Sequence, residues 1–165
     1  MQIIDYNDVT NFLVSQLSLA NTTTAYYPLS AILSTPIVTI TRDDVAVAPL
    51  KKSQYPAIGI IFTSKTEETI EVATNITNKK IELFFRLTVI QDSFINSKAE
   101  LQKIISNIEA NLRYNINISN YKKNGFKVTC GIPKDIKFLS NVNGDSAFNK
   151  TAEIQYSILG HLKNA

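Results

Sequence analysis

Residues 80–90, KIELFFRLTVI, carry the clearest structural pattern in the chain. Every second residue is large and apolar: Ile81, Leu83, Phe85, Leu87 and Val89. Successive side chains of a strand point to opposite faces of a sheet, so this spacing predicts a strand with one buried face. The other face carries Glu82, Arg86 and Thr88. The apolar face needs a second layer of structure to cover it.

A helix over residues 98–114 is the expected cover. It follows a capping box, in which Ser97 and Glu100 each satisfy a backbone amide of the first turn. Its apolar residues recur at helical spacing and form one stripe: Leu101, Ile104, Ile105, Ile108 and Leu112. We therefore expect this stripe to pack on the apolar face of strand 80–90.

A second helix is expected in the first 20 residues, capped by Asn7 or Asp8. Its stripe consists of Val9, Phe12, Leu13 and Leu17. Short β-branched or alternating runs predict further strands at 36–41, 45–47, 57–63, 69–76, 116–118, 126–130, 136–139 and 151–162. The prediction is one α+β domain over residues 1–165, with an antiparallel or mixed sheet and two main helices packed on it. Within it, residues 21–56 form an extended arm that reaches a neighbour or an elaborated loop region.

Composition excludes several classes of protein. The 165 residues are 44% hydrophobic, which is enough to form a core. The net charge of +3 is scattered, whereas nucleic-acid specialists concentrate positive charge on one face. A lone Cys130 closes no internal disulfide and, with a lone His161, builds no multi-ligand zinc site. No apolar stretch is long enough to span a bilayer, so we expect a protein that is cytosolic where it is made.

Catalytic motifs are missing from the sequence. It has no Gly-rich phosphate loop and no nucleophile elbow. His161 is expected to be a solvated surface residue and Cys130 a buried structural thiol. We expect no enzymatic activity, no metal and no cofactor. Three basic pairs, Lys51-Lys52, Lys79-Lys80 and Lys122-Lys123, would contact phosphate only if they converged in the fold or across an assembly.

The order of elements resembles the tail terminator, or tail completion, proteins of tailed bacteriophages. The resemblance rests on the N-terminal helix, the run Tyr55–Ile60, strand 81–89, helix 98–114 and the closing strand 152–158. It covers most of the chain and is a pattern of elements and length, not a motif. It implies a structural virion protein that forms a ring, usually a hexamer, which caps the tail tube and joins it to the head connector. Genomic DNA would pass through the lumen without sequence recognition.

The same resemblance implies the partners and the location. The partners are further copies of the chain, the tail tube protein and head-tail connector proteins. The location is the tail or neck of the virion, and the host cytoplasm during assembly. Two other functions stay open: another head-tail connector or tail-tube component of a phage, and a small non-viral ligand-binding domain.

A subunit interface is expected at the charged loops and the polar side of strand 80–90. Its candidate residues are Arg42, Asp43, Asp44, Lys51, Lys52, Phe84, Arg86 and Ile90. Phe84 and Ile90 are apolar residues that a lone subunit would leave in water, so a contact between subunits would bury them. The alternative is that both lie under the N-terminal helix in a second core layer.

Overall fold

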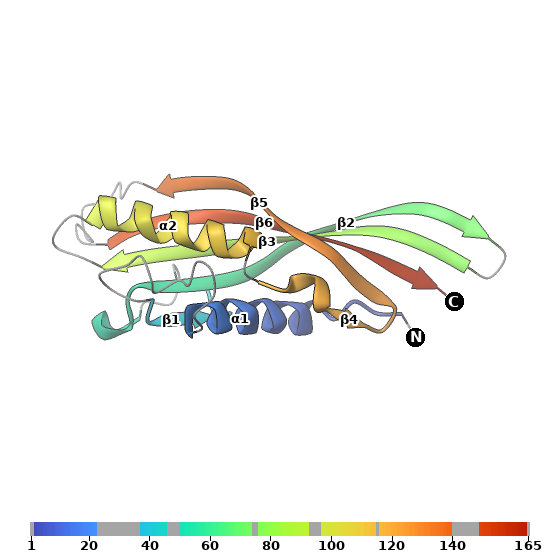
Figure 1. Ribbon diagram of the computed structural model, residues 1–165, viewed down its shortest axis with the longest axis horizontal. Coiled ribbons are helices and arrows are strands. Elements are labelled where there is room, and N and C mark those ends of the chain that lie inside the picture. Colours follow the sequence, from blue (N-terminus) through green and yellow to red (C-terminus); the bar gives the residue numbers. More distant parts are fainter. Residues whose placement is uncertain are drawn as a thin grey trace.

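One twisted six-stranded sheet forms the centre of the protein in a computed structural model (Figure 1). The structure describes residues 2–22, 37–45, 50–73, 76–92, 97–114, 116–139 and 149–164. The strand order is β1-β2-β3-β6-β5-β4. The strands are β1 Thr39–Thr41, β2 Ala57–Ala73, β3 Ile76–Asp92, β4 Lys122–Lys123, β5 Phe126–Leu139 and β6 Asn149–Asn164. The helices are α1 Tyr6–Thr22 and α2 Ser97–Tyr114, with short 3-10 turns at Lys52–Gln54 and Ile118–Asn120.

The sheet is mixed, because β1 runs parallel to β2 and the other paired strands run antiparallel. Both α-helices lie along the same face of the sheet (Figure 1). This arrangement confirms the predicted α+β fold class with two main helices on a mixed sheet.

The main core lies between the helices and that face of the sheet. The alternating residues of β3, from Ile81 to Val89, are at most 1% exposed. They share one cluster with the α2 stripe, with Val9, Leu13 and Leu17 of α1, and with β6 residues such as Tyr156. The predicted packing of the α2 stripe on β3 is therefore confirmed.

The N-terminus of α1 differs from the prediction in its capping residue. Asp5 is the cap, because the Asp8 backbone N–H donates to Asp5 Oδ1 at 3.0 Å. The Asp8 side chain instead accepts a hydrogen bond from Tyr121 Oη at 2.7 Å and pairs with Lys123 Nζ at 3.0 Å. These contacts hold the pKa of Asp8 below its ordinary value. Asp8 thus ties α1 to Tyr121 and to the adjoining strand β4.

Two pairs of predicted strands are each one long strand. Runs 57–63 and 69–76 were expected to be separate, but β2 continues through the polar residues between them to Ala73. The reason is non-local: β3 pairs with β2 along its whole length, for example Lys65 beside Leu83. Runs 126–130 and 136–139 likewise form the single strand β5, whose register shifts near Thr129 and Lys134.

Other expectations fall partly outside the described residues. Of the expected arm or loop over 21–56, residues 23–36 and 46–49 are not described, and neither are the side chains of the expected capping box. The expected strand 45–47 is not formed at Val45, which lies in a turn. The expected strand 116–118 is wrong, since a 3-10 turn begins at Ile118. Within the described segments, no helix combines the length and apolarity needed to cross a membrane.

Candidate interaction surfaces

The face of the sheet away from the helices is covered at one end by the segment that precedes β2. Val45 packs there against Ala57 and Ile90 in a small separate cluster. The segment approaches closely at Gly59, where an added Cβ would lie 2.5 Å from the Asp43 carbonyl oxygen. Only glycine therefore fits at position 59 without a shift of the backbone above it.

Because of this covering segment, the structure differs from the predicted subunit interface. Ile90 is only 6% exposed, so the expectation that a lone subunit leaves it in water is wrong. Its cover is the segment around Val45, not α1 as the alternative had it. Arg86 Nη2 pairs with Asp44 Oδ2 at 3.1 Å within one chain. The sequence could not show this, because the two residues are far apart in the chain.

For the remaining predicted interface residues, a role between subunits stays a prediction. Arg42 Nη1 donates to Asn11 Oδ1 of α1 at 3.1 Å. Asp43 and Lys51 are exposed, and the side chain of Lys52 is not described. Phe84 is half-buried, and Lys134 Nζ lies 5.4 Å from the centre of its ring.

The sheet has two long outer edges without a neighbouring strand among the described residues. β1 pairs with β2 only from Ala57 to Gly59, and β4 pairs with β5 only at Phe126 and Lys127. The outer sides of β2 beyond Ile60 and of β5 beyond Val128 are therefore unpaired in this part of the chain. We call residues 63–73 the β2 edge and residues 129–139 the β5 edge. They lie on opposite sides of the sheet. Unpaired backbone amides and carbonyls make such edges templates for another strand.

The β5 edge exposes apolar side chains. Ile132 and Ile136 are each 37% exposed and Phe138 is 47% exposed. Pro133 and the two register shifts are devices that restrict unwanted pairing at an edge. Three exposed apolar residues, by contrast, favour contact with another chain. The β5 edge is therefore suited to a specific strand partner.

The β2 edge is polar and projects beyond the helices in the long β2–β3 hairpin (Figure 1). All side chains from Thr63 to Ile70 are exposed. Glu67 pairs with Lys65 Nζ at 2.8 Å and also with Lys79 across the hairpin. Hydrogen bonds from Lys65 and then Lys79 lower the pKa of Glu67 to about 2. Ion pairs thus help to hold this edge in strand form without a core.

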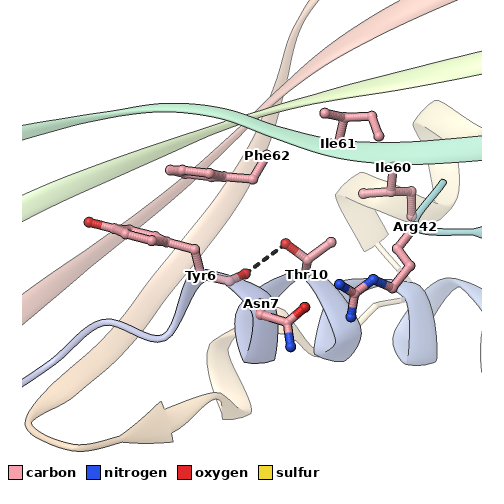
Figure 2. Close-up of a pocket in the computed structure, with 7 residues that line it drawn as sticks. All are labelled: Tyr6, Asn7, Thr10, Arg42, Ile60, Ile61 and Phe62. Carbon is pink, nitrogen blue, oxygen red and sulfur yellow. Dashed lines mark hydrogen bonds between the residues drawn. The ribbon is translucent and has the colours of Figure 1, made fainter. Parts of the chain in front are cut away.

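Two hollows lined by described residues are candidate ligand sites. The first, of about 200 Å³, lies between the start of α1 and β2 (Figure 2). It is lined by Tyr6, Asn7, Thr10, Arg42, Ile60, Ile61 and Phe62. The ring of Tyr6 stacks on Phe62 at 4.5 Å, and Thr10 Oγ1 donates to the Tyr6 carbonyl at 2.7 Å. The second, of about 210 Å³, lies over the hairpin and is lined by Thr66, Glu67, Glu68, Lys80 and Glu82. Small-molecule pockets usually enclose about 300–1,000 Å³, so neither hollow favours a small ligand.

The lone thiol and imidazole have different surroundings from each other. His161 is exposed, as expected. Cys130 is half-buried, so the expectation of a buried thiol is wrong. The register shift after Val128 places Cys130 beside Leu159, on the face away from the helices. Among the described residues, no group of three His, Cys, Asp or Glu side chains is placed to hold a metal ion.

Comparison with known proteins shows a likeness in fold. No family model and no curated protein matches the sequence. One similar solved structure is a chain from a structure described as the virion of a native gene transfer agent particle. The match has a TM-score of 0.50 at 12% identity and covers 93% of this chain and 97% of that chain. At this identity the likeness shows a shared fold across nearly the full length of both chains.

Proposed function

We propose that this chain is a structural protein of a phage-like virion, and more specifically a tail terminator. In this role it forms a ring, usually of six copies, that caps the tail tube and joins it to the head connector while DNA passes through the lumen. The observation that carries the proposal is the fold likeness to a chain of a gene transfer agent virion, which spans 93% of this chain. The order of elements, which resembles tail terminators, supports the finer role.

The two unpaired edges supply a contact from which a ring can close. They are different surfaces on opposite sides of one sheet, so a contact between them is heterologous and repeats from copy to copy. β2 and β5 run in opposite directions, because three antiparallel pairings separate them. Rotation about a ring axis parallel to the strands preserves strand direction, so the β2 edge of one copy would pair antiparallel with the β5 edge of the next.

The strand register shows that the two edges overlap in height. Ser64 of β2 lies beside Phe84, Phe84 beside Ser157, and Ser157 beside Ile132 of β5. Ser64 and Ile132 therefore share one level and one face of the sheet. Pairing between copies at this level would shield Ile132 from water, which is a favourable term in the contact. Ile136 and Phe138 lie at the levels of Ile60 and Ile58, outside the β2 edge.

The proposal includes the absence of catalytic turnover. Catalysis by Cys130 would need a base, an orienting group and donors to an oxyanion, all held together. Cys130 and His161 make no hydrogen bond to each other, although both are described. A structural role needs none of these groups.

A second candidate is another head-tail connector or tail-tube component. The same likeness supports it, because the description of the similar structure names only the particle. The two hollows found among the described residues are small, which speaks against the third candidate, a non-viral ligand-binding domain.

Deletion of the gene from the genome that encodes it, followed by electron microscopy of the particles, separates these functions. A tail terminator stops tube growth, so its loss should give overlong tubes that remain separate from heads. Loss of a tube component should give no tubes, and loss of a connector should give tubes of normal length without heads. Unchanged particles would overturn the proposal. Light scattering of the purified chain should give the mass of a closed ring.

A further inference from the structure

Basic side chains from four strands lie in one row on the sheet face away from the helices. Lys80 of β3 lies beside His161 of β6, His161 beside Lys127 of β5, and Lys127 beside Lys122 of β4. Lys163 follows two residues after His161, on the same face of β6. All five side chains are exposed, and we call them the basic row.

The charge of the row is largely uncompensated. Lys65, Lys79, Lys123 and Lys134 each pair with an acidic side chain, whereas Lys122, Lys127 and Lys163 form no ion pair with a described residue. The nearby acids Glu68 and Glu82 line a hollow with Lys80 at the opposite end of the row. Positive charge is therefore concentrated where β4, β5 and β6 meet. Like charges on adjacent strands destabilise a sheet, so binding of an anionic partner would reduce this repulsion.

We propose that the basic row binds the phosphate backbone of double-stranded DNA without reading its sequence. Neighbouring strands lie about 4.8 Å apart, so a row across four strands is about 15 Å long and can contact several phosphates. Lysine acts on phosphate as a point charge, and such contacts position DNA without specifying bases. The row contains no arginine, the residue that most often reads guanine with two hydrogen bonds.

The position of the row in a ring accounts for a contact between the row and DNA, and this step rests on the proposed function. In a ring closed through the two edges, the sheets form a continuous wall with helices on one side. The helices add a second layer, which has more room on the outer, longer circumference. The face without helices then lines the passage, and the basic row faces the DNA within it.

The test measures DNA affinity by fluorescence anisotropy, with labelled short duplexes of two unrelated sequences. The wild-type chain should bind both equally, and binding should weaken as salt rises. Lys122→Gln combined with Lys127→Gln should weaken binding about tenfold or more at low salt, and should lower the slope of log affinity against log salt by about 2. The matched control is Lys103→Glu, which changes the net charge equally but lies on the exposed side of α2. It should change affinity less than about twofold.

Several results would overturn the basic row as a DNA contact. One is the absence of binding to either duplex, which is expected if the row binds an acidic protein surface instead. The others are a preference for one of the two sequences, and a loss of affinity in Lys103→Glu equal to that of the double variant. Light scattering of the same samples keeps the two proposals apart. Rings that bind no DNA contradict the row and leave the ring intact. A monomer whose DNA binding depends on the row contradicts the ring and supports the row.

Discussion

The two halves of β2 have the same backbone pairing and opposite surroundings. From Ala57 to Ile60 every residue is buried, whereas from Thr63 to Ile70 every side chain is exposed. β3 pairs with both halves. The first half lies between the helices and the segment around Val45, whereas the described residues place no such layer on either face of the second half.

The comparison shows that strand pairing and burial have different causes here. Pairing with β3 is enough to extend a polar run into a strand, while burial needs packed layers on each face. The covered half therefore determines stability, and the uncovered half is free to contact another molecule. Each of the following variants tests one side of this division.

Ile105→Asp should have the largest effect, because it removes the layer over the covered half. Ile105 is 3% exposed in the main core, and an unpaired carboxylate there costs more than about 4 kcal/mol. We expect no cooperative unfolding transition by circular dichroism. The control is Ser106→Asp, at an exposed position of the same helix, which should keep its transition. A cooperative transition of Ile105→Asp near the wild-type midpoint would refute this packing.

Gly59→Val should destabilise the covered half by a smaller amount. A Cβ at Gly59 would lie 2.5 Å from the Asp43 carbonyl oxygen and 3.1 Å from Val45 Cγ2, so the covering segment must shift. Such overpacking costs about 1–3 kcal/mol, measured as a change in urea unfolding free energy. Ser64→Val, in the exposed half of the same strand, should change it by less than about 0.5 kcal/mol. Equal effects at the two positions would remove the distinction between the halves.

Glu67→Gln should have a small, pH-dependent effect on the uncovered half. The pKa of Glu67 is about 2 in the folded chain, below its ordinary value of 4.5. Its contribution is therefore fully present above 4.5 and is lost as the pH falls towards 2. Because the pairs are exposed and screened, we expect a loss of about 0.5 kcal/mol at neutral pH that vanishes near pH 2. Urea midpoints at both pH values test this, with Glu68→Gln as the control. If the difference in stability between wild type and Glu67→Gln grew as the pH fell, the assigned ion pairs of Glu67 would be contradicted.

His161→Ala combined with Cys130→Ser should have the smallest effect. Neither side chain belongs to the core, and a protein without catalytic turnover needs neither group as a catalyst. The four lysines of the basic row remain in this variant. We expect particle yield and morphology in a complementation assay to match wild type. A well-folded double variant that yields no particles would count against a purely structural role.

Local patterns predicted the parts of the fold that depend on local periodicity. The alternation of residues 81–89 and the apolar stripes of both helices correspond to the buried faces in the structure. The polar middle of β2 was missed, because its strand form depends on pairing with β3 and not on its own sequence. Cys130 was placed wrongly because a register shift in β5 changes which face each later residue occupies.

The candidate surfaces were predictable to a lesser degree. The sequence showed Lys79-Lys80 and Lys122-Lys123 as separate pairs, and only the register brings Lys80 and Lys122 into one row with Lys127. The unpaired edges depend on strand order, which no local pattern contains. Ile90 appeared suited to a subunit contact because the segment that covers it comes from a distant part of the chain.

The pairing of the β2 edge with the β5 edge of a second copy is tested most directly by cysteine cross-linking. In a Cys130→Ser background, Ile132→Cys is combined in turn with Ser64→Cys, Thr66→Cys or Glu68→Cys, all on the same face of the sheet. Adjacent strands bring paired Cβ atoms within reach of a disulfide. After oxidation, a non-reducing gel should show a ladder from dimer to closed ring for at least one double variant, and monomer for each single variant. Two results would contradict edge-to-edge closure. One is that every double variant runs as a monomer on the gel although light scattering gives it the mass of a ring. The other is a cross-linked dimer formed by the Ile132→Cys variant alone.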